Sequence, residues 1–77
     1  MFKYKNTEIY PVQIKHSIKD KKGYITYVCN DGNLYILFRY NTKYDFISSN
    51  IAINKKYSIT YMKVGYLYIL TDLVKLL

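Results

Sequence analysis

Cys29 and His16 are the side chains of this sequence that come nearest to a catalytic nucleophile and its base. If a strand at residues 12–18 pairs with a strand at residues 24–29, His16 lies opposite Tyr27 and close to Cys29, on one face of the sheet. That face carries the apolar side chains of both strands, so it is the expected core. An inward cysteine is usually an inert small hydrophobe, and an inward histidine usually satisfies a hydrogen bond. We therefore expect a contact between His16 and Tyr27, and no catalysis.

The carboxylates offer no better catalytic pair. The aspartates sit at expected turns or helix caps, where a short acid stabilises local backbone, and Glu8 has no obvious acidic partner. One histidine and one cysteine are too few ligands for a metal site, and no glycine-rich loop with Lys and Ser or Thr could cradle a phosphate. The sequence therefore predicts a protein without enzymatic activity, metal or cofactor. The aspartates in question are Asp20, Asp31, Asp45 and Asp72.

The positive charge is the main indication of a partner. Twelve Lys and Arg residues against five acids give a net charge of +7, which attracts polyanions such as nucleic acid. Abundant Lys, Asn, Ile and Tyr also match AT-rich codon usage, but glutamate has AT-rich codons too, and Glu8 is the only one. Codon bias therefore explains the lysines better than it explains the scarcity of acids.

The elements that would position these residues are mostly strands. Eleven tyrosines and ten isoleucines favour strands over helices, and Pro11 fits near the start of the first strand. Residues 41–56 allow either a short helix capped by Asp45 or a short strand near 51–53. The expected strands are 12–18, 24–29, 34–40, 57–62 and 66–70, with a first turn at 20–23.

Asp31 and Gly32 lie between two apolar runs and favour a type I′ hairpin turn. Such a turn sets a register in which every apolar pair lies on one face, which is the expected core. The core pairs are Cys29 with Leu34, Tyr27 with Ile36, and Ile25 with Phe38. The outward pairs are Val28 with Tyr35, Thr26 with Leu37, and Tyr24 with Arg39. The pairing of the first two strands adds Lys19 opposite Tyr24 to the outward face.

The C-terminal part is expected to form a second hairpin. A three-residue loop at 63–65, with Gly65 in the left-handed position, sets Tyr61 opposite Leu67. In that register Tyr66 and Tyr68 lie outside, whereas Tyr57 and Tyr61 belong to the core.

Three meandering strands, a connection of about sixteen residues and a closing hairpin are the element order of a five-stranded, OB-like barrel; an SH3-like barrel is the nearest alternative. A final helical turn through Leu77, capped by Thr71 or Asp72, would close one end of the core. The 77 residues have room for one small all-β domain, a barrel over residues 1–77.

A lone cysteine excludes an internal disulfide and indicates a reducing, cytoplasmic location. The longest apolar stretch, residues 64–70, is far below the ~20 residues that cross a bilayer, so no membrane partner is expected.

On the outward face of this barrel, cations and aromatic rings alternate. Flat rings offer a stacking surface to bases, worth about 1–3 kcal/mol each, while the flanking cations meet phosphates. We therefore expect binding to single-stranded nucleic acid, DNA or RNA. The expected contact residues are Lys15, Lys19, Lys21, Lys22, Tyr24, Tyr35, Arg39, Lys63, Tyr66 and Tyr68.

The same surface allows other partners. Most lysines are simply solvated, and outward tyrosines also pack well in protein interfaces. One alternative is a small viral or mobile-element interaction module, an inhibitor or adaptor in the host cytoplasm, that binds an acidic protein partner. The other is a homo-oligomer that buries Tyr66 and Tyr68 between copies.

Overall fold

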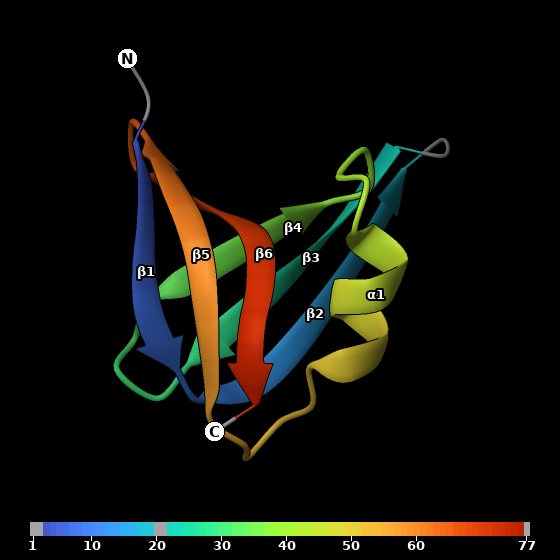
Figure 1. The fold of residues 1–77 in the computed structure, drawn as a ribbon. Coiled ribbons are helices and arrows are strands. Elements are labelled where there is room, and N and C mark those ends of the chain that lie inside the picture. The colour runs from blue at the N-terminus through green and yellow to red at the C-terminus, as the bar shows by residue number, and fades with distance from the viewer. Residues whose placement is uncertain (1–2, 20–21, 77) are drawn as a thin grey trace.

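The computed structural model describes residues 3–19 and 22–76, and within these ranges the chain forms six β-strands and one short α-helix (Figure 1). The predominance of strands agrees with the composition. In chain order the elements are β1 (Tyr4–Ile9), β2 (Pro11–Lys19), β3 (Lys22–Cys29), β4 (Leu34–Phe38), α1 (Tyr44–Asn50), β5 (Tyr57–Val64) and β6 (Leu67–Leu76).

The strands form one mixed sheet in the order β1-β5-β6-β4-β3-β2, in which only β4 and β6 pair in parallel. Figure 1 shows β1, β5 and β6 crossing in front of β4, β3 and β2, with α1 beside them. The backbone N–H of Asn30 donates to the carbonyl of Tyr10 at 3.0 Å, and that of Asn54 donates to the carbonyl of Pro11 at 2.8 Å. These bonds hold the corner where β1 passes into β2. The sheet is curled but not closed into a barrel, so the expected five-stranded barrel, OB-like or SH3-like, is wrong.

β1 is a strand that the sequence pattern does not reveal. Ile9 is its only buried residue, so the strand lacks the alternation of apolar and polar residues that marks a half-buried strand. It forms along the free edge of β5, where Thr7 pairs with Ile59 and Ile9 pairs with Tyr57. Backbone hydrogen bonding to an available edge, rather than side-chain burial, explains this strand.

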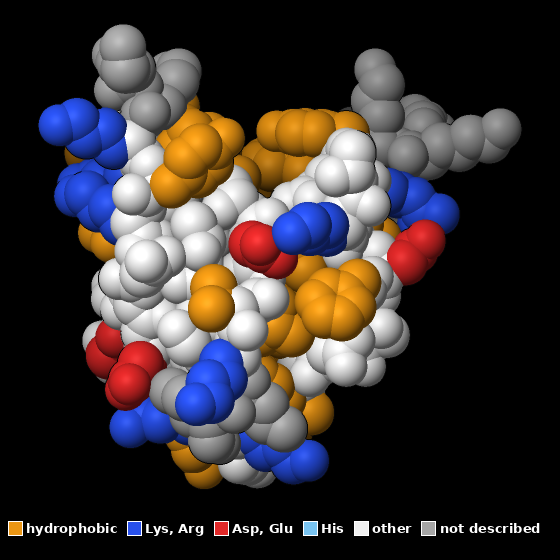
Figure 2. Space-filling model, in the orientation of Figure 1, with side chains coloured by type: hydrophobic (Ala, Val, Ile, Leu, Met, Phe, Trp, Pro, Cys, Tyr) orange, Lys and Arg blue, Asp and Glu red, His pale blue; other side chains and the backbone are white. Residues whose placement is uncertain are grey.

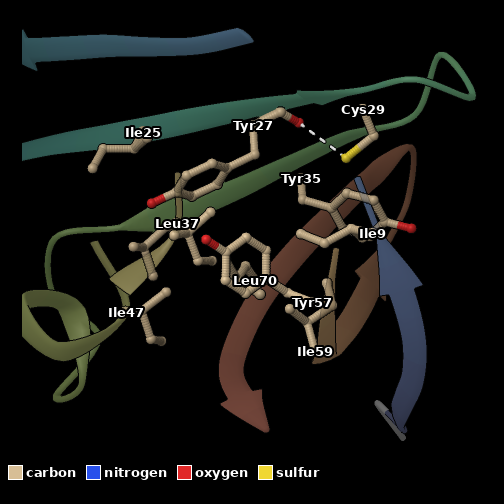
Figure 3. Packing of buried hydrophobic residues seen from close by; sticks show 11 residues of the cluster. Ile9, Ile25, Tyr27, Cys29, Tyr35, Leu37, Ile47, Tyr57, Ile59 and Leu70 are labelled. Carbon is tan, nitrogen blue, oxygen red and sulfur yellow. Dashed lines mark hydrogen bonds between the residues drawn. The ribbon is translucent and has the colours of Figure 1, made fainter. Parts of the chain in front are cut away.

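The core lies between the two crossing halves of the sheet (Figure 3). Tyr27 and Leu37 point into it from β3 and β4, and Ile59 and Leu70 point into it from β5 and β6. Tyr57 is buried, as expected, and its hydroxyl accepts a 2.8 Å hydrogen bond from the backbone N–H of Ala52. Among the described residues, the buried hydrophobic cluster contains Ile9, Ile25, Tyr27, Cys29, Tyr35, Leu37, Ile47, Ile51, Tyr57, Ile59 and Leu70.

The ambiguous segment contains a helix, α1, rather than a strand near residues 51–53. Ile47 and Ile51 are buried, whereas Phe46 is exposed. Asp45 is not the expected cap: the cap position is Lys43, and Asp45 lies within the first turn. A carboxylate there is still stabilised by the positive end of the helix dipole.

The expected helical turn at the C-terminal end is wrong, because β6 continues as a strand. Pairing with β5 satisfies its backbone, with Thr60 opposite Asp72. The side chains of Thr71 and Asp72 are used elsewhere than at a helix cap. The hydroxyl of Thr71 donates to the carbonyl of Thr60 at 3.0 Å, and Asp72 forms a 2.9 Å ion pair with Lys43.

Candidate interaction surface

The β3–β4 hairpin pairs one residue away from the expected register, and this decides which face of β4 is outside. Tyr27 lies opposite Tyr35, where the sequence pattern predicts Ile36. Because side chains alternate along a strand, a slip of one residue moves every side chain of β4 to the other face. Tyr35 is therefore buried, and the expectation that it faces outward is wrong. The outward side chains of β4 are instead Leu34, Ile36 and Phe38.

The loop between β3 and β4 explains the slip. The backbone N–H of Cys29 donates to the carbonyl of Asn33 at 2.9 Å, so the loop closes one residue before Leu34. Asp31 accepts a 2.9 Å hydrogen bond from the backbone N–H of Asn33, and Gly32 has a φ of +89°. Asn30 thus joins Asp31 and Gly32 in a three-residue loop, Asn33 lies opposite Cys29, and Leu34 then pairs with Val28.

The β2–β3 pairing is displaced by two residues, which preserves the faces. His16 lies opposite Ile25, and Lys19 lies opposite Lys22, so neither the His16–Tyr27 pair nor the row of Lys19 with Tyr24 forms. Lys15 remains on the outer side of the sheet, as expected. It is exposed and lies opposite Thr26. Lys19 and Lys22 mark the ends of their strands, and Lys21 lies outside the described residues.

The β5–β6 hairpin has a shorter turn than expected, formed by Gly65 and Tyr66 alone. Gly65 has a φ of +60°, as expected for a left-handed position, and Tyr66 is fully exposed. Tyr61 consequently pairs with Leu70 instead of Leu67. The shift of three residues turns Tyr68 to the core side, contrary to expectation.

Tyr68 packs in a cluster with Tyr35 and Tyr61. Its ring centroid is 5.5 Å from each of the other two, stacked on Tyr35 and edge-on to Tyr61. Such aromatic pairs add about 0.5–1.5 kcal/mol beyond their buried area. Burial raises the pKa of Tyr35 to about 12. Tyr35 therefore belongs to the core, and the half-buried rings of Tyr61 and Tyr68 pack against it.

Two expected contact cations also contact tyrosines. Phe38, not Arg39, lies opposite Tyr24, so Arg39 projects toward the other side of the sheet. Its guanidinium carbon lies 5.5 Å from the ring centroid of Tyr44, the first residue of α1. The ammonium nitrogen of Lys63 similarly lies 5.7 Å from the ring centroid of Tyr68. The expected row of alternating cations and rings across three strands is not formed.

An apolar groove occupies the outer face of the sheet instead, and we call it the outer groove. It spans β3, β4 and the start of β6, with a volume of about 350 Å³. Tyr24, Leu34 and Leu67 are 41%, 48% and 44% exposed, so no layer of the described chain covers them. Figure 2, seen with β1, β5 and β6 in front, shows that hydrophobic side chains are also exposed on that face, among scattered charged side chains of both signs. The lining residues of the outer groove are Tyr24, Thr26, Leu34, Ile36, Phe38 and Leu67.

Aromatic rings extend the outer groove at one end. The centroid of Phe38 lies 6.1 Å from that of Tyr24 and 5.2 Å from that of Tyr40, with which it is stacked. Tyr40 is 80% exposed and follows β4 directly. Three rings thus lie side by side where the sheet meets solvent.

Cys29 and His16 do not form a catalytic pair in this fold. Cys29 is buried, and its Sγ lies 3.9 Å from the carbonyl oxygen of Tyr27. Burial, with a smaller contribution from the charge of Asp31, raises the pKa of the Cys29 thiol to about 11. His16 is exposed on the edge strand β2. A protonated, buried thiol is a poor nucleophile.

Within residues 3–19 and 22–76 no group of three or more His, Cys, Asp or Glu side chains could hold a metal ion, and no helix there is long and apolar enough to cross a membrane. The sequence pattern missed Leu34, Ile36 and Phe38 as surface residues, because β4 is apolar on both faces and alternation alone cannot assign them.

No protein-family model matches the chain, and no curated protein and no solved structure is similar enough to indicate a relationship.

Proposed function

We propose that this domain acts by binding a protein partner through the outer groove and that it has no enzymatic activity. The observation that carries the proposal is a contiguous apolar surface that the described chain leaves uncovered. Isolated exposed apolar residues need no explanation, but apolar residues that line one groove indicate an interaction site.

The residue types support a protein rather than a small ligand. Interface cores are enriched in aromatic residues and depleted of charge, and the outer groove combines Tyr24 and Phe38 with aliphatic side chains. Its volume of about 350 Å³ is at the lower end of the ~300–1,000 Å³ range of small-molecule pockets. Individual side chains of a protein partner could fill the groove while the rest of the partner stays outside it.

Single-stranded nucleic acid, DNA or RNA, is the second candidate. The stacked rings of Phe38 and Tyr40 lie beside Tyr24, and Lys15 is on the same face. The net charge of +7 would add attraction to phosphates. Against this candidate, Tyr35 and Tyr68 pack in the core cluster, and the groove between the rings and β6 is aliphatic.

Site-specific photocrosslinking in the cells that produce the protein tests the proposal. A benzophenone amino acid replaces Leu34 or Leu67 in the outer groove, and in the matched control it replaces Ile53, which is 46% exposed outside the groove. The proposal predicts adducts of discrete mass that survive nuclease treatment, at the groove positions only. Adducts that a nuclease removes would favour nucleic acid, and adducts of twice the 9.2 kDa chain mass would show a second copy. Equal labelling at Ile53 would contradict a groove interaction.

A further inference from the structure

The outer groove has an uneven electrostatic environment. None of its lining residues is charged, and Lys15 on β2 lies directly opposite the lining residue Thr26. Lys15 is exposed, and no described salt bridge involves it. An apolar floor with a cation at its rim favours a ligand that places a carboxylate beside its apolar side chains.

The described carboxylates form no ion pair with Lys15. Glu8 is paired with Lys56 at 3.4 Å, and Asp72 is paired with Lys43 at 2.9 Å. Asp31, in the loop before β4, accepts hydrogen bonds from the backbone and side-chain nitrogens of Asn33 at 2.9 and 3.2 Å.

The remaining described carboxylate, Asp45, lies in the first turn of α1, away from the groove lining. Among the described carboxylates only Asp31 lies close along the chain to a lining residue, Leu34, and none of them forms an ion pair with Lys15.

A second copy of the chain is a poor occupant for the same reason. Face-to-face packing would bring together two domains that each carry a charge of +7, with no carboxylate in either groove. Like charges placed together at an interface disfavour association, whereas an acidic partner gains attraction and a faster encounter. Charge complementarity thus selects an acidic protein.

The spacing of the β4 side chains defines the apolar anchors. Leu34, Ile36 and Phe38 follow one another at every second residue, which corresponds to about 6.6–6.8 Å along a strand. Residues i and i+4 of a helix lie about 6 Å apart along its axis, and residues i and i+2 of a strand match β4 directly. A short amphipathic segment can therefore place consecutive anchors along the groove.

We propose that the outer groove binds an acidic amphipathic segment of a partner protein, with apolar anchors about 6–7 Å apart and a carboxylate directed to Lys15. This inference rests on the proposed function, because it names the chemistry of the partner at the same surface. It goes further in predicting which segments the groove selects and which cation contributes to the choice.

Selection from a library of random 16-residue segments displayed on yeast tests this inference. The purified 77-residue protein is the bait, and segments that also bind a Leu34→Glu variant are removed. Ile53→Glu is the matched control, because Ile53 and Leu34 are exposed to nearly the same extent, 46% and 48%. Thermal unfolding must show both variants folded; if Leu34→Glu is not, Leu67→Glu replaces it as the groove variant.

The expected result is enrichment of segments with apolar residues at helical or strand spacing and a net negative charge. Their affinity should fall about five-fold with Lys15→Glu and little with Lys55→Glu, a matched exposed lysine in the loop before β5. Enriched segments that are apolar but not acidic, or that ignore Lys15→Glu, would overturn the inference and leave the proposed function standing. If no segment distinguishes the wild-type protein from the groove variant, the proposed function fails as well.

Discussion

At the scale of single residues, burial determines which groups of this protein can react. Cys29 and Tyr35 both lie in the core, and burial holds their protons on. The pKa of Cys29 rises from 9.0 to about 11, and that of Tyr35 rises from 10.0 to about 12. Burial raises the pKa of Tyr27 as well.

These shifts predict a loss of stability at alkaline pH. The folded state binds the protons more tightly than the unfolded state, so the stabilisation is complete below the unfolded pKa values. It declines as pH rises from about 9 to 11 for Cys29 and from about 10 to 12 for Tyr35. Urea unfolding measured between pH 8 and 12 should show this decline. Cys29→Ala should remove the part of the decline that begins at the lowest pH. A free energy of unfolding that stays constant to pH 12 would contradict the assignment.

Leu70 provides a test of the core itself. It is fully buried in β6 and lies opposite Tyr61, so Leu70→Ala should lower the free energy of unfolding by about 2–5 kcal/mol. Val74 on the same strand is 59% exposed, and Val74→Ala should change the free energy of unfolding by less than about 0.5 kcal/mol. Chemical denaturation of the two variants makes the comparison. Similar losses would mean that β6 is not oriented as described.

At the scale of elements, short turns determine the register and therefore the surface. The β3–β4 loop includes Asn30 as well as Asp31 and Gly32, and the β5–β6 turn uses only Gly65 and Tyr66. In both hairpins the observed strand register differs from the expected register by an odd number of residues. The following strand is therefore turned over in each hairpin, which buries Tyr35 and moves Tyr68 to the core side.

Gly65 gives this conclusion a direct test. Its φ of +60° is unfavourable for an L-residue, while a Cβ built on it would contact no atom within 4 Å. Gly65→Ala should therefore cost about 1–3 kcal/mol of stability through backbone strain alone. D-Alanine at the same position, introduced by chemical synthesis, should restore or exceed the original stability because a D-residue prefers positive φ. If L- and D-alanine had equal effects, the left-handed turn would be wrong.

At the scale of the whole molecule, the charge of +7 acts on every anion, whereas the outer groove acts on apolar groups. Measuring the binding of oligonucleotides across a salt series separates the contribution of the net charge from that of the outer groove. The proposed function predicts binding to single-stranded DNA and RNA only at low salt, with less than a two-fold change in affinity for Tyr24→Ala at fixed salt. Fluorescence anisotropy measures both. A loss of about 1–3 kcal/mol with Tyr24→Ala would indicate base stacking and favour the nucleic-acid candidate.

The sequence by itself determined the features that depend on local chemistry. Strand-forming residues, the turns around Gly32 and Gly65, and the burial of Tyr57 follow from residue type and near neighbours. The outward position of Tyr24 and the outer side for Lys15 were also predictable, because their strands alternate clearly.

Only the tertiary structure decided the features that depend on distant partners. β1 is a strand because β5 offers an edge, and β6 extends to Leu76 because β5 pairs with it as far as that residue. Both faces of β4 are apolar, so the sequence allows either Leu34 or Tyr35 to face the core. The loop before β4 decides between them because it sets the register with β3. The physical reason is that the side-chain period of a strand is two, so a single residue in a turn decides which half of its side chains meets a partner.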